Sequence, residues 1–216
     1  MNNARRSEAA ILEQYRVALE NVKNQPAIAT EMAELSYDIP KITEGEQLLA
    51  TTRGAYDTKQ QEDNETIEAS ATFKKEKETL SEMYKKHRKK AKAILRKQPE
   101  ALKKLGLTNT TPKAYTNWIE TIRTFYSTTD QAIMEQLATL KITAEDMTTG
   151  LAQIQKVEQA RAEYLKEVGE SEDATKQKDA AFAKLDDWMR DFYAVANIAL
   201  EDQPQLMEAL GRKRKS

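Results

Sequence analysis

Apolar positions recur at steps of three and four residues along almost the whole sequence. That spacing places side chains on one face of an α-helix, and no two-residue alternation typical of a strand competes with it. The pattern therefore predicts an all-α protein, folded as an antiparallel helical bundle. Clear examples are Ile11, Tyr15, Leu19 and Val22 near the start, Trp118, Ile119 and Ile122 in the middle, and Leu185, Met189 and Phe192 towards the end.

Proline, glycine and capping residues mark several expected helix ends. Pro99 and Pro204 each stand where a short helix is expected to begin, and Gly106 and Gly211 stand where C-terminal caps belong. Thr143 is followed by two acidic residues, which are favoured at a helix start by the helix dipole. These signals predict two short terminal helices and a further helix that begins after Thr143.

Other segments predict boundaries or interruptions. Thr111–Pro112 has the form of a capping hydroxyl before a proline at the first helical position. The run Gly169-Glu170-Ser171-Glu172-Asp173 predicts a break or a sharp bend. Gly54 and the polar run 57–64 are candidates for an interruption between residues 45 and 98.

Several residues recur in the same order in the two halves of the chain. Their shared order favours a duplication, with a first helical unit at 1–107 and a second at 108–216. We expect the two units to pack as one bundle-like domain, with side-by-side and elongated end-to-end packing both open. The matched pairs are Ile28 with Ile133, Gln98 with Gln203 and Gly106 with Gly211 at an offset of 105, Phe73 with Phe182 and Tyr84 with Tyr193 at 109, and Lys41 with Lys141 at 100.

Three segments of the sequence resemble a family of all-helical bacterial proteins of similar length that has no assigned function. The segments are 105–126, 185–192 and 198–211, about a fifth of the chain. The resemblance implies an all-helical fold. It implies no catalytic residue at any position.

Composition excludes several kinds of chemistry. The 216 residues include no Cys and one His, with 34 Lys and Arg against 35 Asp and Glu. Without cysteine there are no disulfides and no thiolate ligands, and a di-iron bundle site needs two Glu-x-x-His motifs. We therefore expect a protein that is not an enzyme and holds no cofactor and no metal. No apolar run is long enough for a membrane helix, so we expect a cytoplasmic protein without a membrane partner.

The single histidine, His87, lies on or beside an apolar stripe. A partly buried packing histidine is the expected role, rather than a ligand or a catalyst. Its basic neighbours along the chain, Lys86 and Arg88 among them, should disfavour protonation if they are also close in space.

One segment departs from the balanced charge of the whole chain. Residues 85–104 hold ten basic residues and one acid, Glu100, and the C-terminal tail is basic as well. These side chains form a possible anion-binding or partner-binding patch, although solvated or internally paired faces give the same pattern. The patch comprises Lys85, Lys86, Arg88, Lys89, Lys90, Lys92, Arg96, Lys97, Arg212, Lys213, Arg214 and Lys215.

The sequence is most typical of a non-enzymatic helical scaffold or protein-interaction protein. The partner is expected to be another protein or a second copy, and exposure of Ile198, Leu200 and Leu206 would favour self-association. The alternative is a nucleic-acid-associated protein that uses the basic helix 85–104 and the basic tail.

Overall fold

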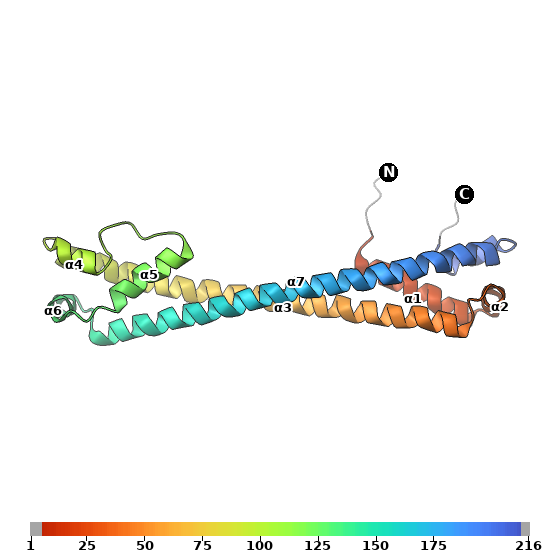
Figure 1. Cartoon of the computed structure of the whole chain (residues 1–216), viewed down its shortest axis with the longest axis horizontal. Coiled ribbons are helices and arrows are strands. Elements are labelled where there is room, and N and C mark those ends of the chain that lie inside the picture. The colour runs from red at the N-terminus through yellow and green to blue at the C-terminus, as the bar shows by residue number, and fades with distance from the viewer. Residues whose placement is uncertain (1–5, 213–216) are drawn as a thin grey trace. The chain divides into compact units, whose positions relative to one another are not determined.

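The structure, a computed structural model, describes residues 6–212. Within that range its regular secondary structure consists of helices, joined by turns and loops (Figure 1). The predicted all-α fold is confirmed. The elements are α1 (Glu8–Asn24), α2 (Pro26–Glu34), α3 (Ile39–Ile94), α4 (Pro99–Lys104), α5 (Tyr115–Tyr126), α6 (Gln131–Thr139), α7 (Ala144–Ala199) and the 3-10 helix η1 (Pro204–Glu208).

The chain divides into two compact units. The first comprises Met1–Asp63 and Glu170–Ser216, and the second comprises Asn64–Gly169. Each unit thus takes residues from both sides of the boundary that the sequence placed between 107 and 108. The difference arises because α3 and α7, 56 residues each, both continue from one unit into the other.

The first unit closes its core around the beginning of α3 and the end of α7. Ile28 and Met32 of α2 and Leu185 and Phe192 of α7 are fully buried there. Thr52 Oγ1 of α3 donates a hydrogen bond to the carbonyl of Ala181 on α7, at 3.2 Å. Buried leucine, isoleucine and phenylalanine side chains each contribute roughly 1.5–3 kcal/mol, so this core holds the short helices in place.

The second unit uses the other ends of the same two helices. Leu80 and Leu95 of α3 are fully buried with Ile122 of α5 and Leu137 of α6. Gln153 Nε2 of α7 donates to the backbone carbonyl of Glu76 on α3 at 3.2 Å and to its carboxylate at 2.6 Å. In both units the two long helices run antiparallel.

Several elements of the two units are separated by 105 residues along the chain. Helices α2 and α6 both have nine residues and begin at Pro26 and Gln131. The turns that follow them each hold a residue with positive φ, Ser36 at 68° and Lys141 at 56°. The same offset pairs the fully buried Leu80 with Leu185. The nearby aromatic residues Phe73 and Tyr84 were matched in the sequence at an offset of 109 instead.

Most of the predicted helix ends agree with the structure. Pro99 and Pro204 begin α4 and η1, and Gly106 and Gly211 have φ of 65° and 73°, as left-handed C-terminal caps require. Thr143 caps α7, because its hydroxyl accepts from Asp146 N at 3.2 Å while its own N–H donates to the Asp146 carboxylate at 2.8 Å.

The predicted interruptions are wrong. Helix α3 continues through Gly54 and the polar run 57–64, and α7 continues through residues 169–173. One glycine costs only about 1 kcal/mol in a helix interior, and polar residues stay solvated on a helix surface. Thr111–Pro112 begins no helix either, since α5 starts at Tyr115.

The glycines of the long helices provide a test of this packing. A Cβ at Gly45 would overlap the Trp188 ring, and a Cβ at Gly150 would overlap the Tyr126 ring, whereas Gly54 and Gly169 face open space. We expect G45A and G150A to lower the free energy of unfolding by about 1–3 kcal/mol through overpacking.

The matched controls should change in the opposite direction. G54A and G169A should raise the free energy of unfolding by roughly 0.5–1 kcal/mol, because alanine is the better helix former. Urea denaturation of the four variants measures both effects. Stabilisation by G45A or G150A would contradict the packing of Trp188 or Tyr126 described here.

Candidate functional site

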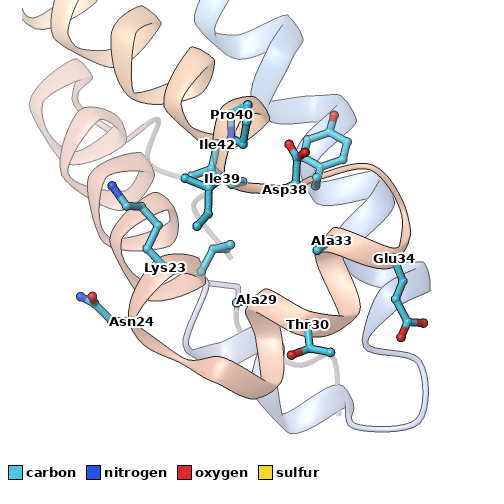
Figure 2. Close-up of a pocket in the computed structure, with 12 residues that line it drawn as sticks. Lys23, Asn24, Ala29, Thr30, Ala33, Glu34, Asp38, Ile39, Pro40 and Ile42 are labelled. Carbon is cyan, nitrogen blue, oxygen red and sulfur yellow. The ribbon is translucent and has the colours of Figure 1, made fainter.

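The first unit contains a large apolar groove between α1, α2 and the beginning of α3 (Figure 2). Its volume is about 890 Å³, within the range of sites that bind ligands or side chains of a partner. The lining residues are Val22, Lys23 and Asn24 of α1, Ala29, Thr30, Ala33 and Glu34 of α2, Tyr37 and Asp38 of the turn, and Ile39, Pro40 and Ile42 of α3.

The turn between α2 and α3 holds the groove open. Ser36 adopts φ 68°, and the N–H of Tyr37 donates to the carbonyl of Met32 at 2.9 Å. The carboxylate of Asp38 then accepts from Lys41 N at 3.1 Å, which caps the first turn of α3. Together these bonds fix the angle at which α3 leaves α2.

The ring of Tyr37 anchors this turn to α7. Its centroid lies 5.8 Å from that of Trp188 and 6.0 Å from that of Phe192. Burial and the nearby Asp191 raise the pKa of the Tyr37 hydroxyl, so the phenol remains protonated at neutral pH. The turn at one end of the groove is therefore packed against α7.

Small side chains create the space inside the groove. Val22 and Ile42 form a buried floor, while Ala29 and Ala33 are the wall that α2 contributes. The position that corresponds to Ala29 in the second unit is Met134, whose side chain packs against that unit's core. The small side chain of Ala29 leaves space in the first unit, whereas the larger side chain of Met134 fills the corresponding space in the second unit.

An exposed apolar residue extends the groove to the surface. Ile39, the first residue of α3, is 70 % exposed, and Leu35, the residue that follows α2, is 41 % exposed. Large aliphatic side chains that remain in water next to a concave apolar surface are typical of sites where another molecule binds.

The rim of the groove carries an excess of negative charge. Lys23 Nζ lies 3.1 Å from a carboxylate oxygen of Glu46, and Lys41 pairs with Glu44 at 2.7 Å, so each lysine has an acidic partner. Within the described part of the chain, Glu34 and Asp38 form no ion pair. A basic group on a bound molecule would therefore be attracted to this rim.

The residues of the predicted basic patch are distributed over several places. Lys85, Arg88, Lys89 and Lys92 line one pocket of the second unit. Lys86 and Lys90 lie near His87 instead, while Arg96 and Lys97 are exposed outside the pocket.

The basic tail is not part of that pocket. Arg212 belongs to the first unit, with its guanidinium carbon 4.1 Å from the centroid of the Tyr193 ring. Lys213, Arg214 and Lys215 lie outside the described residues.

The apolar end of α7 is largely covered within the first unit. Leu200 is buried and Leu206 is half-buried, whereas Ile198 is 61 % exposed. Of these three side chains, only Ile198 keeps the exposure that would favour self-association.

His87 is half-buried, and its Nδ1 lies 3.1 Å from the hydroxyl oxygen of Tyr126. Its pKa is lowered, chiefly by burial, with Lys90 and Lys86 adding to the effect and Asp146 opposing it. The basic neighbours thus act in the predicted direction, but desolvation is the larger cause.

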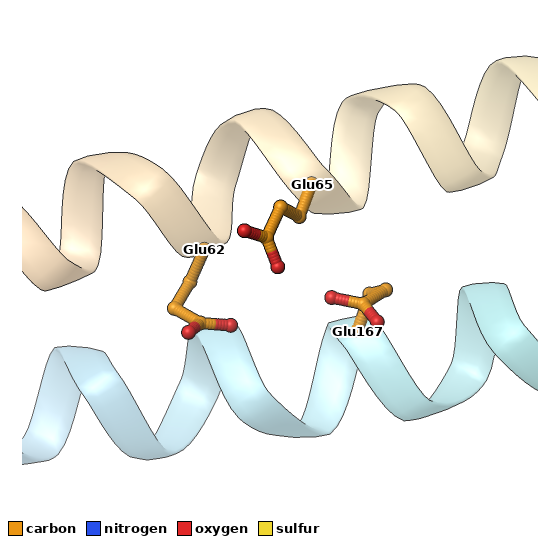
Figure 3. A group of neighbouring side chains, drawn as sticks. All are labelled: Glu62, Glu65 and Glu167. Carbon is orange, nitrogen blue, oxygen red and sulfur yellow. The ribbon is translucent and has the colours of Figure 1, made fainter.

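Three glutamates of the long helices are drawn in Figure 3. Glu62 belongs to the first unit, whereas Glu65 and Glu167 belong to the second. Glu167 is buried, and its Oε1 accepts from Lys166 Nζ at 2.8 Å. That ion pair lowers the pKa of Glu167, which keeps the carboxylate ionised.

None of the helices described here is long and apolar enough to cross a membrane. Comparisons with protein-family models, with curated proteins and with solved structures return no match. The candidate sites therefore have to be interpreted from their own geometry, and the family resemblance stays a prediction.

Sequence reasoning missed the groove entirely. Ala29 and Ala33 look like ordinary members of a helical stripe, and their small size matters only once α1 and α3 enclose them. The available signal was the pair of acidic residues, Glu34 and Asp38, that separates two apolar segments and is followed by Ile39.

The environment of His87 can be measured directly. An NMR titration should give a His87 pKa below the ordinary value of 6.5, because burial disfavours the charged ring. The unfolded chain then binds the proton more readily, so His87 adds stability above about pH 6.5 that is lost as the pH falls.

The opposing carboxylate supplies a matched pair of variants. D146N should lower the pKa of His87 further, because it removes the one nearby charge that favours protonation. E145Q, at the exposed neighbouring position, should leave that pKa unchanged. A His87 pKa above 6.5 in the unmodified chain would contradict this account.

Proposed function

We propose that this chain is a non-enzymatic helical protein that binds a partner protein through the groove of the first unit. The observation that carries the proposal is an open apolar volume of about 890 Å³ with Ile39 exposed at its edge. The partner contributes an amphipathic helix whose large apolar side chains enter the groove, a recurring mode of recognition by helical proteins.

The chemistry of the partner follows from the rim. Glu34 and Asp38 lie on the side of the groove opposite Lys23, which has Glu46 as its acidic partner (Figure 2). A lysine or arginine beside the apolar face of the partner helix complements these two carboxylates. Charge of this kind speeds association and selects the partner more than it adds affinity.

The lining of the groove also favours binding over catalysis. It consists of aliphatic side chains, one amide, one phenol, one hydroxyl, one lysine and two carboxylates, of which Asp38 caps α3. No pair of these groups is arranged as a nucleophile and base. A cytoplasmic location remains part of the proposal, consistent with the lack of cysteine.

A filled groove should not bind the partner helix. The probe is a fluorescent model peptide with leucines at positions i, i+3, i+4 and i+7 and lysines at its flanks, titrated against the full chain by anisotropy. We expect A29W to weaken its binding by about tenfold or more, since the indole occupies the groove.

Two controls distinguish binding in this groove from nonspecific hydrophobic binding. A27W places the same ring on an exposed position of α2 that does not line the groove, and should bind as the unmodified chain does. A peptide with glutamates in place of the flanking lysines should bind more weakly. Equal binding of both peptides, equal binding by A29W, or no binding at all would each reject the proposal.

Self-association is tested in the same preparation. Sedimentation over a range of protein concentrations should show a monomer. A concentration-dependent dimer that I39E abolishes would mean that the groove is occupied by a second copy, and would overturn the proposed partner.

A further inference from the structure

A second concave site, independent of the groove, lies within the second unit. It has a volume of about 460 Å³ and is formed by α3, the segment before α5 and the first turns of α5. The lining residues are Ser81, Tyr84, Lys85, Arg88, Lys89, Lys92, Thr111 and Trp118.

The regular spacing of α3 brings its cations together. Lys85, Arg88 and Lys92 follow at steps of three and four residues, which places them on one helix face with Lys89 beside them. None of the lining residues is acidic. Like charges three or four residues apart on a helix repel each other weakly, and a bound anion would relieve that repulsion.

Within the described residues, acidic side chains compensate little of the positive charge of this pocket. Lys85 Nζ lies 3.4 Å from a carboxylate oxygen of Glu82, and both side chains are largely exposed. Such a pair contributes little to stability. Arg88, Lys89 and Lys92 form no ion pair among the described residues, so three cationic groups remain for a ligand.

The arginine of the pocket is held in place by its neighbours. Arg88 Nη2 donates to the carbonyl of Asn109 at 2.5 Å, and the Arg88 side chain is half-buried. Burial raises the pKa of the Tyr84 hydroxyl, while the neighbouring Arg88 and Thr111 oppose that rise. The guanidinium is therefore oriented before a ligand binds.

We propose that this pocket binds a terminal phosphate group. Arg88 is already oriented by Asn109 and donates to one phosphate oxygen, while Lys89 and Lys92 supply charge. The Thr111 hydroxyl donates to a second oxygen. A terminal phosphate is favoured over a backbone phosphodiester because it is a dianion with three oxygens open to these donors.

The same phosphate chemistry can arrive in two forms. One is a free small molecule such as pyrophosphate, and the other is a nucleic-acid strand with a 5′ phosphate. Both forms place a terminal phosphate next to Arg88. Trp118 is largely buried and closes one side of the pocket, with Lys77 Nζ 5.4 Å from its ring centroid.

Calorimetric titration of the full chain with pyrophosphate tests the site. We expect R88Q to weaken binding about tenfold, which is the loss typical of one charged hydrogen bond. R96Q makes the same change in the same basic segment at an exposed position outside the pocket, and should stay within about twofold. K92Q, which removes charge without removing the contact of Arg88 with Asn109, covers the case in which R88Q fails to fold.

Fluorescence supplies a second measurement. The chain has two tryptophans, so W188F leaves Trp118 as the only indole. Pyrophosphate should change the emission of Trp118 in that variant. Absence of pyrophosphate binding, or equal losses in R88Q and R96Q, would overturn the proposal.

Oligonucleotides with and without a 5′ phosphate distinguish the two sources. Tighter binding of the phosphorylated strand, lost in R88Q, would support a nucleic-acid terminus as the ligand, whereas binding of pyrophosphate alone would support a small molecule. Equal binding of both strands that R88Q leaves unchanged would mean attraction to the phosphate backbone by the whole basic segment, and would contradict a terminal-phosphate site.

Discussion

The continuity of α3 and α7 is the constraint on which both units depend. Helix α3 gives Ile42 to the core of the first unit and Leu80 and Leu95 to that of the second, while α7 gives Ile154 to the second core and Leu185 to the first. Each buried aliphatic side chain contributes about 1.5–3 kcal/mol to stability. Both cores therefore need the buried residues of both long helices. Neither half of the sequence therefore contains a complete unit, and both candidate sites are supported by long helices that begin or end elsewhere.

Corresponding positions of the two units carry different chemistry. Ala29 leaves the groove open in the first unit, whereas Met134 packs into the core of the second. On the long helices, Arg88 and Lys92 of the second unit correspond to Tyr193 and Asn197 of the first. The same arrangement of helices thus supports an apolar groove with an acidic rim in one unit and a cationic pocket in the other. This difference is the basis for assigning them different ligands.

Local signals predicted what depends on local physics. The caps at Gly106, Gly211 and Thr143 could be found because backbone geometry and capping hydrogen bonds act within a few residues. The continuous path of α3 past Gly54 could not, since tertiary packing outweighs the small penalty of one glycine. The spacing of Lys85, Arg88 and Lys92 predicts the part of the cationic pocket that lies on α3. Thr111 and Trp118 are distant in sequence and line the pocket only because the chain folds back onto α3. The groove was missed because it consists of space beside small side chains, and that space exists only once α1, α2 and α3 have packed.

The central functional claim, that the first unit binds a helix in its groove, is tested most directly by locating the contact on the intact chain. Amide hydrogen exchange should be measured by mass spectrometry with and without the lysine-flanked amphipathic peptide. The account predicts slower exchange confined to residues 22–42, where the walls of the groove and the turn at Ser36 lie. Protection that falls instead on residues 81–118, or that is spread evenly over both units, would contradict it.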